Sequence, residues 1–167
     1  GTYYVTVSEF VPKFFLERLL TTFRHRIVED LKSDLTASRR SLADVMKMAS
    51  LIEAETRTDE ERPLISGILW KRFDAGTLLG VDAAVRYIVN EPGQGLTSAD
   101  LQIDSPYNLR KFKGLPPAPI GNPSLSSIQA ALHPKISEFW YYLHDRDGQI
   151  HYATSLEEHN VNKARYL

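Results

Sequence analysis

Apolar residues recur at helical spacing near the start of the chain. From Phe15 to Leu31 an apolar residue returns every three or four positions, after Ser8 as a candidate N-cap and Pro12 in the first turn. This pattern predicts a long amphipathic helix that ends near Ser33. Residues 2–7 alternate and are rich in β-formers, which predicts a short strand or the tail of a preceding subdomain. We therefore expect a strand and a long helix in residues 1–40 that lead into a core formed by residues 41–167.

The core region carries signals for further helices. Ser41, with Asp44 three residues later, predicts the start of a helix whose apolar positions continue to Ile52. Thr58 and Glu61 match a capping box, which predicts a helix of apolar residues that Gly76 ends. Helices are also predicted from Ser124 through His133 and from Ser155 to the C-terminus. Two runs of β-formers, 139–143 and 150–153, flank Asp145-Arg146-Asp147-Gly148 and predict a β-hairpin.

Between Gly76 and Gly121 the periodicity weakens and turn residues accumulate. Asn90-Glu91-Pro92-Gly93 predicts a turn, and a short helical piece is expected after Thr97. A long irregular stretch inside a compact domain is usually functional. We expect an α+β fold, mainly helical, with a long irregular segment that forms a cleft and a C-terminal β-hairpin.

Composition narrows the class of protein. With 167 residues and 43% hydrophobic content, the chain is long enough for one ordinary core. A net charge of -1, from 20 basic and 21 acidic residues, provides no field to attract nucleic acid. No apolar run reaches the roughly 18 to 20 residues that span a bilayer. We expect a soluble piece of a longer protein that does not bind nucleic acid.

The motifs exclude several kinds of catalysis. The chain has no cysteine, no Gly-x-Ser-x-Gly and no Ser-x-x-Lys, which disfavours acyl transfer through a serine or cysteine nucleophile. Its five histidines lack metal-binding spacing, and no glycine loop is suited to a phosphate, so neither a metal nor a cofactor is expected. Carboxylate acid/base chemistry remains, and glycosidic bonds are its usual target.

Two glutamates at the end of the second predicted helix are candidate acids. Glu53 and Glu55 are two residues apart, so they project about 200° apart and only one is expected to face a substrate. Glu53 continues the stripe of Leu42, Met46 and Ala49, whereas Glu55 lines up with Met48 and Leu51. A glutamate partly desolvated beside Met and Leu would have a raised pKa. The pattern leaves open which glutamate this is, and whether either one is merely solvated or a cap. It also leaves open whether Glu61 only caps its helix or belongs to the cleft.

Several motifs in one order resemble a known family, the YceG-like endolytic murein transglycosylases (MltG). They are Ala49-Ser50-Leu51-Ile52-Glu53-Ala54-Glu55-Thr56, Glu61-Arg62, Trp70-Lys71-Arg72-Phe73, Gly80-Val81-Asp82, Ser105-Pro106-Tyr107-Asn108, Gly114-Leu115-Pro116-Pro117-Ala118-Pro119-Ile120, Asn122-Pro123 and Glu158-His159-Asn160. The resemblance implies that residues 1–167 form the catalytic domain of a peptidoglycan lytic transglycosylase, a lyase of cell wall biogenesis. Such enzymes cleave the β-1,4 bond from N-acetylmuramic acid to N-acetylglucosamine without water and leave 1,6-anhydro ends.

The resemblance also implies roles for particular residues. The second glutamate of Glu-x-Glu-Thr is the catalytic one, which is Glu55; a single carboxyl suffices because the muramyl C6 hydroxyl is the nucleophile. The residues implied in substrate binding line the cleft, hold its loop rigid or orient Glu55 and its helix end. They are Tyr107 and Asn108 in the cleft, Pro116 and Pro117 in the loop, Glu61 and Arg62 beside Glu55, and Asp82.

One segment departs from the family pattern. Gly80-Val81-Asp82-Ala83-Ala84 stands where typical members have Gln-Ser/Thr-Asp-Pro-Thr, and Ala118 replaces a frequent glycine. The departure keeps two alternatives open. One is a muramidase-like hydrolase in which Asp82 or Glu61 positions water, and the other is an inactive glycan-binding or scaffold module.

The family also implies a location and partners. Typical members are bacterial, with a membrane helix and a LysM-like subdomain before the catalytic region, and neither is visible in this chain. The implied location is the extracytoplasmic face of the cytoplasmic membrane, to which the full-length protein is anchored. The implied partners are peptidoglycan glycan strands and peptidoglycan synthases.

Overall fold

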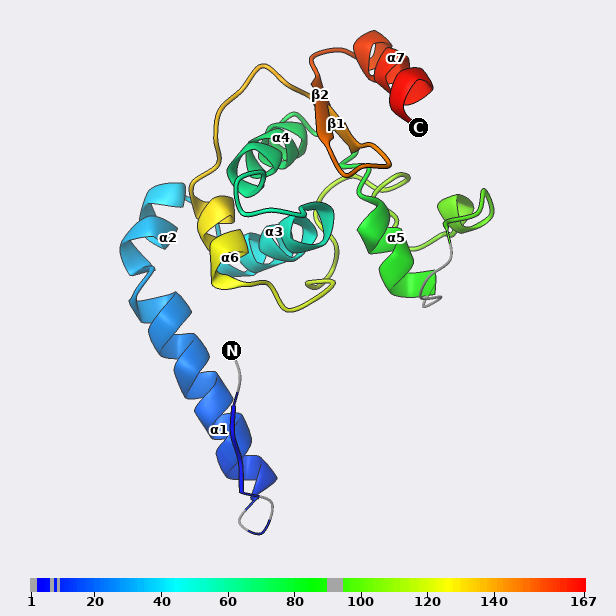
Figure 1. Cartoon of the computed structure of the whole chain (residues 1–167). Coiled ribbons are helices and arrows are strands. Elements are labelled where there is room, and N and C mark those ends of the chain that lie inside the picture. The colour runs from blue at the N-terminus through cyan, green and yellow to red at the C-terminus, as the bar shows by residue number, and fades with distance from the viewer. Residues whose placement is uncertain (1–2, 7, 9, 90–94) are drawn as a thin grey trace. The chain divides into compact units, whose positions relative to one another are not determined.

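The computed structural model describes residues 3–6, 8, 10–89 and 95–167, which divide into two compact units, Gly1–Arg39 and Arg40–Leu167. Figure 1 shows the elements of each unit in order. The α+β prediction is confirmed, because helices dominate and one antiparallel hairpin accompanies them. Within the described residues, no helix combines the length and apolar character needed to cross a membrane.

The first unit corrects the prediction of one uninterrupted helix. It contains α1 (Pro12–Phe23), the π-helix η2 (Arg24–Glu29) and α2 (Lys32–Ser38). The widened turn arises because the Asp30 N–H bonds to the His25 carbonyl at 2.9 Å, five residues back. Helix α1 begins after Val11 rather than Ser8, with proline in its first turn. Helical structure therefore extends beyond the predicted end, with one interruption.

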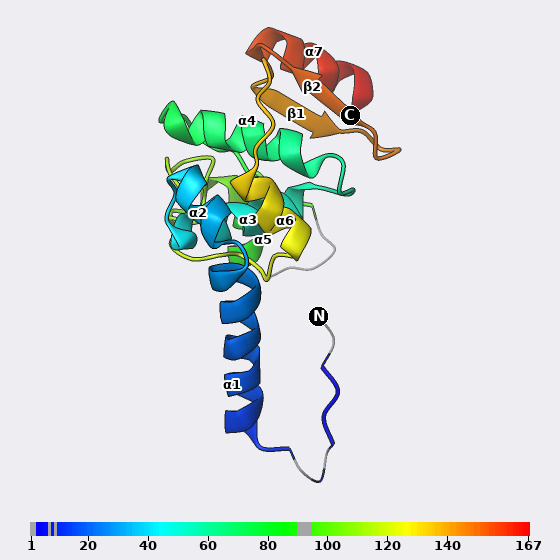
Figure 2. The same cartoon turned by 90° about the vertical axis from the view of Figure 1, so that its left-hand side faces the viewer.

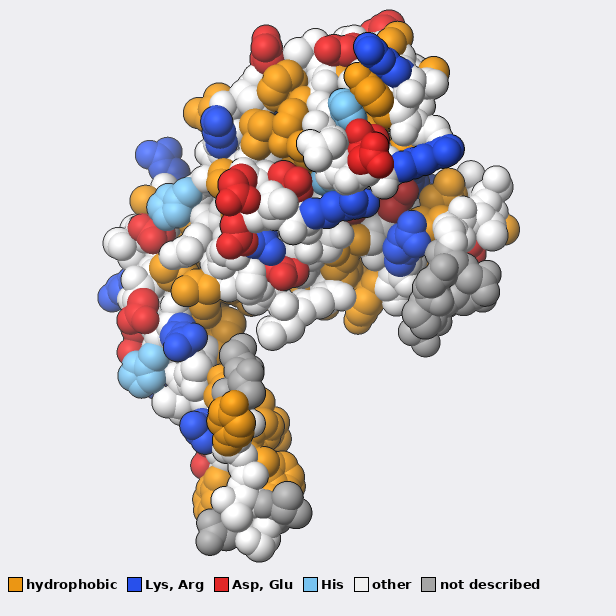
Figure 3. Space-filling view, in the orientation of Figure 1, with side chains coloured by type: hydrophobic (Ala, Val, Ile, Leu, Met, Phe, Trp, Pro, Cys, Tyr) orange, Lys and Arg blue, Asp and Glu red, His pale blue; other side chains and the backbone are white. Residues whose placement is uncertain are grey.

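The segment before α1 is not the predicted strand. Residues 3–6 have no strand partner and form no strand, while residues 2 and 7 lie outside the described part of the chain. Tyr3 instead packs edge-on against Phe15, with ring centroids 6.0 Å apart. Apolar side chains gather over α1 in Figure 3, and Phe14, Leu16 and Leu20 are largely exposed. The first unit is thus mainly helical, with apolar side chains exposed along α1.

Helix α3 (Leu42–Glu55) is the centre of the second unit. Its predicted start is confirmed, because the Ser41 hydroxyl accepts the N–H of Asp44 at 3.0 Å. Five of its apolar side chains are fully buried, namely Val45, Met48, Ala49, Leu51 and Ile52. They pack toward α4 (Arg62–Asp74) and α6 (Leu125–Leu132), which lie beside α3 in Figures 1 and 2. This packing fixes the C-terminal end of α3.

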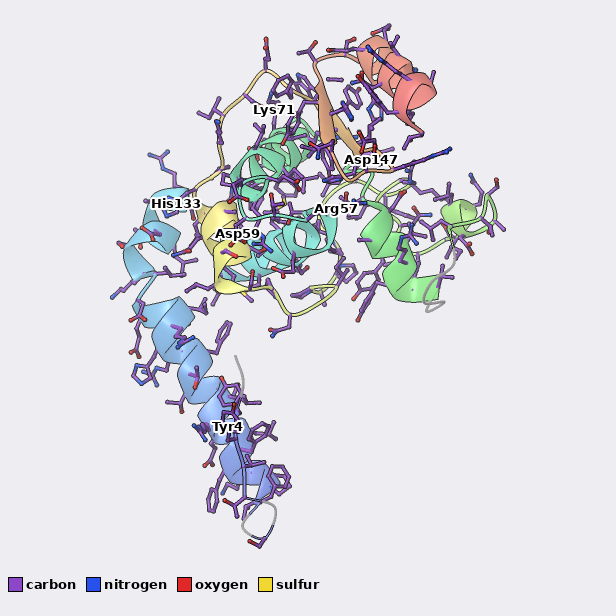
Figure 4. The ribbon with its side chains drawn as sticks, viewed as in Figure 1. Tyr4, Arg57, Asp59, Lys71, His133 and Asp147 are labelled. Carbon is purple, nitrogen blue, oxygen red and sulfur yellow. The ribbon has the colours of Figure 1, made fainter. Side chains whose placement is uncertain are left out.

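Helix α4 starts later than the capping pattern predicts. Residues 59–61 form a turn and the helix begins at Arg62, yet the Glu61 carboxylate still accepts hydrogen bonds from the backbone N–H groups of Arg57 and Thr58. Gly67 faces the carbonyl of Lys135, and a Cβ there would collide with that backbone oxygen. Lys71, labelled in Figure 4, donates to the carbonyl of Phe139 at 2.9 Å. Helix α4 is thus tied to the chain that leads into the hairpin.

A helix was missed in the stretch expected to be irregular. Helix α5 (Asp82–Val89) buries Ala84 and Val85 and packs against α3. Eight residues are too few for a clear helical period, and so short a helix depends on tertiary packing. The short piece predicted after Thr97 is present as the 3-10 helix η3 (Asp100–Gln102). The turn predicted at residues 90–93 lies outside the described residues.

The C-terminal elements follow the prediction closely. Ser124 caps α6, and Ser155 caps α7 (Leu156–Tyr166). Strands β1 (Tyr141–His144) and β2 (Ile150–Ala153) pair antiparallel, with Tyr142 opposite Tyr152. In both Figures 1 and 2 the hairpin lies between α4 and α7. Figure 4 places Arg57 near the hairpin turn, where its guanidinium occupies the space beside Gly148.

Candidate active site

The end of α3 opens into a polar cavity of about 370 Å³ within the second unit. The residues that line it come from α3, α4, the start of α5, the hairpin, α7 and the loop that carries Arg110, which are distant in sequence. They are Glu55, Arg72, Gly80, Asp82, Arg110, Tyr141, Tyr142, Leu143, His144, Leu156, His159, Lys163 and Leu167. Of the residues singled out in the sequence for catalysis or binding, Glu55 and Asp82 are brought together here.

Glu55 is partly buried and is held by two donors. The Tyr142 hydroxyl donates to its Oε2 at 2.9 Å, and the backbone N–H of Ala83 also donates to the carboxylate. Burial raises the pKa of Glu55 and the charge of Asp82 raises it further, while both hydrogen bonds and His144 act in the opposite direction. The net pKa lies above 4.5. Glu55 therefore retains its proton to a higher pH than an ordinary glutamate, as a general acid requires.

Glu53 has a different environment. Its Oε2 accepts hydrogen bonds from the Ser124 N–H at 3.0 Å and from the hydroxyls of Ser124 and Ser127 at 2.6 Å each. Burial alone would raise its pKa, but these bonds and the charge of Arg62 bring the pKa below 4.5. Glu53 is therefore an ionised clamp between α3 and the start of α6. The geometry separates two carboxyls that the residue pattern could not distinguish.

Arg62, expected to orient Glu55, contacts Glu53 instead. Arg62 is 3.7 Å from the carboxylate of Glu53, pairs with Asp59 and donates to Ser126 at 2.8 Å. Figure 4 shows Asp59 beside α6. Arg62 thus supports the clamp between α3 and α6 and is not among the described residues that line the cavity.

Glu61 combines the two roles that the sequence left open. Burial acts to raise its pKa, but hydrogen bonds from backbone N–H groups and from His144 bring that pKa below 4.5. Its carboxylate lies 3.1 Å from Nε2 of His144, and the imidazole of His144 lines the cavity. Glu61 therefore stabilises the turn before α4 and also positions a cavity residue.

Asp82 is placed beside Glu55 by the first turn of α5. Its carboxylate forms an ion pair with Arg110, and this hydrogen bond raises the pKa of Arg110. The negative charge of Asp82 is close enough to Glu55 to raise the pKa of the latter. Asp82 therefore acts on the acid electrostatically while Arg110 holds it in place.

Tyr107 and Asn108 occupy a different place from the expected cleft. Asn108 is fully buried, and its amide donates to the carbonyls of Leu101 and Ile103 at 3.0 and 2.9 Å. Tyr107 packs against Tyr87, with ring centroids 5.2 Å apart. Neither residue is among the described side chains that line the cavity. The hydrogen bonds of Asn108 hold the 101–111 loop, and its expected contact with the substrate stays a prediction.

The proline-rich loop is fixed along α3. Pro116 is buried and Pro117 is exposed. Farther along the loop, the Ile120 N–H donates to the hydroxyl of Ser50 at 3.0 Å. The loop therefore packs against the helix that carries Glu55, and neither proline is among the described residues that line the cavity.

Sequence reasoning missed most of the cavity wall. Tyr142 lies within a run of β-formers that predicts only a strand, and no sequence motif indicates a role for Lys163. Arg72 and His159 stand in two of the motifs quoted for the resemblance, which was their one available signal. Their importance follows from tertiary contacts.

The fold and the cavity define an α+β domain in which a glutamate of raised pKa, Glu55, lies near a second carboxylate, Asp82. In the described part of the chain, no group of three or more histidine, aspartate or glutamate residues is arranged to hold a metal. A sequence profile described as the YceG-like family matches residues 1–165. The chain belongs to the YceG-like family.

Individual relatives agree with this assignment. The chain is 36% identical over 140 residues to an endolytic murein transglycosylase of Bacillus subtilis, a match that covers 84% of this chain and 39% of that protein. A Streptococcus pneumoniae protein of the same name is 31% identical over 141 residues, covering 81% of this chain and 26% of that protein. The chain thus spans less than half the length of both curated relatives.

A solved structure has the same fold. The crystal structure of a putative YceG-like protein from Listeria monocytogenes superimposes with a TM-score of 0.89 at 30% sequence identity. The match covers 96% of this chain and 52% of that chain. Both units are therefore part of a fold shared within the family.

Proposed function

We propose that this chain is the catalytic region of an endolytic murein transglycosylase, with residues 41–167 as its catalytic core and residues 1–40 leading into it. The observation that carries the proposal is Glu55, a carboxyl of raised pKa in a polar cavity. The names of the two curated relatives support murein as the substrate. The reaction is nonhydrolytic cleavage of the bond from N-acetylmuramic acid to N-acetylglucosamine, which is the chemistry of a lyase.

Glu55 serves twice in this reaction. As an acid it gives its proton to the bridging oxygen while the bond from that oxygen to muramyl C1 breaks. As a base it then accepts the proton of the muramyl C6 hydroxyl while that oxygen bonds to C1, and a 1,6-anhydro end forms. Between the steps Glu55 is a carboxylate, which the Tyr142 hydroxyl and the Ala83 N–H stabilise. No second carboxyl is required because the nucleophile belongs to the substrate.

A second candidate is a muramidase-like hydrolase. The observation in its favour is Asp82, a carboxylate in the same cavity as Glu55 that Arg110 holds in place. Asp82 would activate a water molecule for attack on C1, as the second carboxylate of an inverting glycosidase does.

Product masses separate these reactions. We expect uncrosslinked glycan strands incubated with the chain to yield 1,6-anhydro ends, which are lighter by one water than reducing ends. Reducing ends as the initial product would assign the hydrolase instead. Strand binding without new ends would assign an inactive glycan-binding module.

Tyr142→Phe is expected to shift the pH dependence of cleavage. Loss of the hydroxyl removes a donor to the charged form of Glu55 and so raises the pKa of Glu55. Activity that needs protonated Glu55 falls as the pH rises through that pKa, so this limb of the profile moves to higher pH in the variant. We also expect turnover to fall about tenfold, because a hydrogen bond to the carboxylate is lost.

The measurement is kcat/KM against pH for both proteins. Tyr152→Phe is the matched control, because it makes the same change directly across the hairpin and leaves the donor on Glu55 in place. An unshifted profile in Tyr142→Phe would show that the hydroxyl does not act on the acid.

Family membership also supports a location. We place the full-length protein at the extracytoplasmic face of the cytoplasmic membrane, where nascent glycan strands are its substrate and peptidoglycan synthases are its partners. Cleavage at this site would release or shorten strands during cell wall biogenesis.

A further inference from the structure

Besides the carboxyl groups of Glu55 and Asp82, the cavity has a wall of basic side chains, which come from α4 and α7. Arg72 comes from α4, while His159 and Lys163 come from successive turns of α7, and all three line the same cavity. The Tyr141 ring connects them, because the Arg72 guanidinium lies 5.3 Å from its centroid and the His159 ring stacks on it at 5.1 Å. Two carboxyls and a group of cations therefore share one small space.

The charge of Arg72 is held in place without a carboxylate partner. Its Nε donates to the Leu78 carbonyl at 3.0 Å, which fixes the side chain. Burial lowers the pKa of Arg72, although the guanidinium remains positive. Among the described residues, no carboxylate forms an ion pair with Arg72 or with Lys163. A partly buried cation that protein carboxylates do not neutralise favours an anionic ligand.

The positive charges at this wall also act on His159. Burial lowers its pKa, and the positive charges of Lys163, Arg72 and Arg110 lower it further. Its Nδ1 is buried and has no hydrogen-bond partner among the described residues. The three cations therefore disfavour protonation of the imidazole, whose buried Nδ1 is an unused polar atom. An anion bound here would stabilise the imidazolium and would raise the pKa of His159.

On the basis of the proposed function, we infer that Arg72, Lys163 and His159 form a subsite for a carboxylate of the glycan strand. Sugar hydroxyl and acetamido groups are neutral, so the anions of murein are the lactyl carboxylate of muramic acid and the carboxylates of the stem peptide. A muramyl residue without a stem peptide carries the first and a residue with a stem peptide carries the second, so either carboxylate is attached to the sugar whose C1 is attacked. The subsite would therefore position that residue, with its carboxylate at the cationic wall and its glycosidic oxygen toward Glu55.

The test measures the pKa of His159 by NMR with three soluble probes. They are the disaccharide GlcNAc-MurNAc with its free lactyl carboxylate, the same disaccharide carrying a stem peptide, and chitobiose, which has no carboxylate. The first two lack the bond that the enzyme cuts, so the unmodified chain can be used. We expect a carboxylate probe to raise the pKa of His159 and chitobiose to leave it unchanged.

The probes also identify the source of the carboxylate. A rise with the free lactyl group alone identifies the lactyl carboxylate, because the stem peptide converts that group to an amide. A rise with the peptide-bearing disaccharide alone identifies the stem peptide. No rise with either probe, or an equal rise with chitobiose, would overturn the subsite.

Lys163→Gln adds a second, independent measurement. We expect the dissociation constant of the carboxylate probe to rise about tenfold, which corresponds to the loss of one charge-assisted hydrogen bond. Arg165→Gln removes the same charge from the same helix but lies outside this cavity, so it is the control. Equal dissociation constants in the two variants would contradict the role of Lys163.

Binding of the carboxylate probes is measured by NMR, and cleavage of glycan strands is measured separately by product mass. Anhydro ends from the unmodified chain, together with no shift at His159, would leave the proposed function standing and remove the subsite. A carboxylate-specific shift without any cleavage would keep the subsite and contradict the proposed function.

Discussion

Glu55→Gln is expected to abolish cleavage of glycan strands, lowering turnover by about a thousandfold or more. The amide keeps the size of the side chain but has no proton to give to the bridging oxygen and cannot accept one from the C6 hydroxyl. Both steps of the proposed reaction are therefore lost together. The measurement is the rate of appearance of new strand ends by mass spectrometry, and substantial residual activity in a clean preparation would remove Glu55 from the mechanism.

The same variant is expected to fold normally and to lose part of the pH dependence of stability. Because the folded pKa of Glu55 is raised above 4.5, its contribution to stability is present below that pH and is lost as the pH rises through the folded pKa. Replacement by a neutral amide removes this loss. We expect Glu55→Gln to have a free energy of unfolding at pH 7 at least equal to that of the parent chain, measured by urea titration.

Glu53→Gln, the same change two residues earlier, is expected to have the opposite effects. The carboxylate of Glu53 accepts three hydrogen bonds from Ser124 and Ser127 and lies near Arg62. Loss of its charge weakens the join between α3 and α6 by about 2 kcal/mol, an estimate reduced for partial solvent screening of the side chain. Urea titration measures this loss, and the folded variant should still cleave strands.

The pH dependence gives a further check on Glu53. Its folded pKa lies below 4.5, so its contribution to stability is present above that pH and is lost as the pH falls through the folded pKa. The stability difference between Glu53→Gln and the parent chain should therefore shrink in acid. If Glu53→Gln abolished cleavage and Glu55→Gln only destabilised the fold, the assignment of the two carboxyls would be reversed.

Local signals predicted much of the fold correctly. The caps at Ser41, Ser124 and Ser155 and the turn that ends at Gly148 each involve a few adjacent residues, so the sequence alone specifies them. The errors arose where local signals were short or interrupted. Helix α5 is too short to show a period, and the π-helical turn after Phe23 interrupts a helix whose apolar pattern continues through it.

The candidate site likewise depends partly on local sequence and partly on tertiary contacts. The sequence by itself determined that a glutamate pair ends a helix, and the resemblance to a family selected Glu55. Only the tertiary structure decided that the carboxylate of Glu53 accepts hydrogen bonds from serine hydroxyls and that Glu55 lines a cavity. The physical reason is that burial and electrostatic fields depend on residues far apart in the chain, such as Tyr142, which lies 87 residues from the carboxyl it contacts. Neither helical period nor capping pattern carries information over that separation.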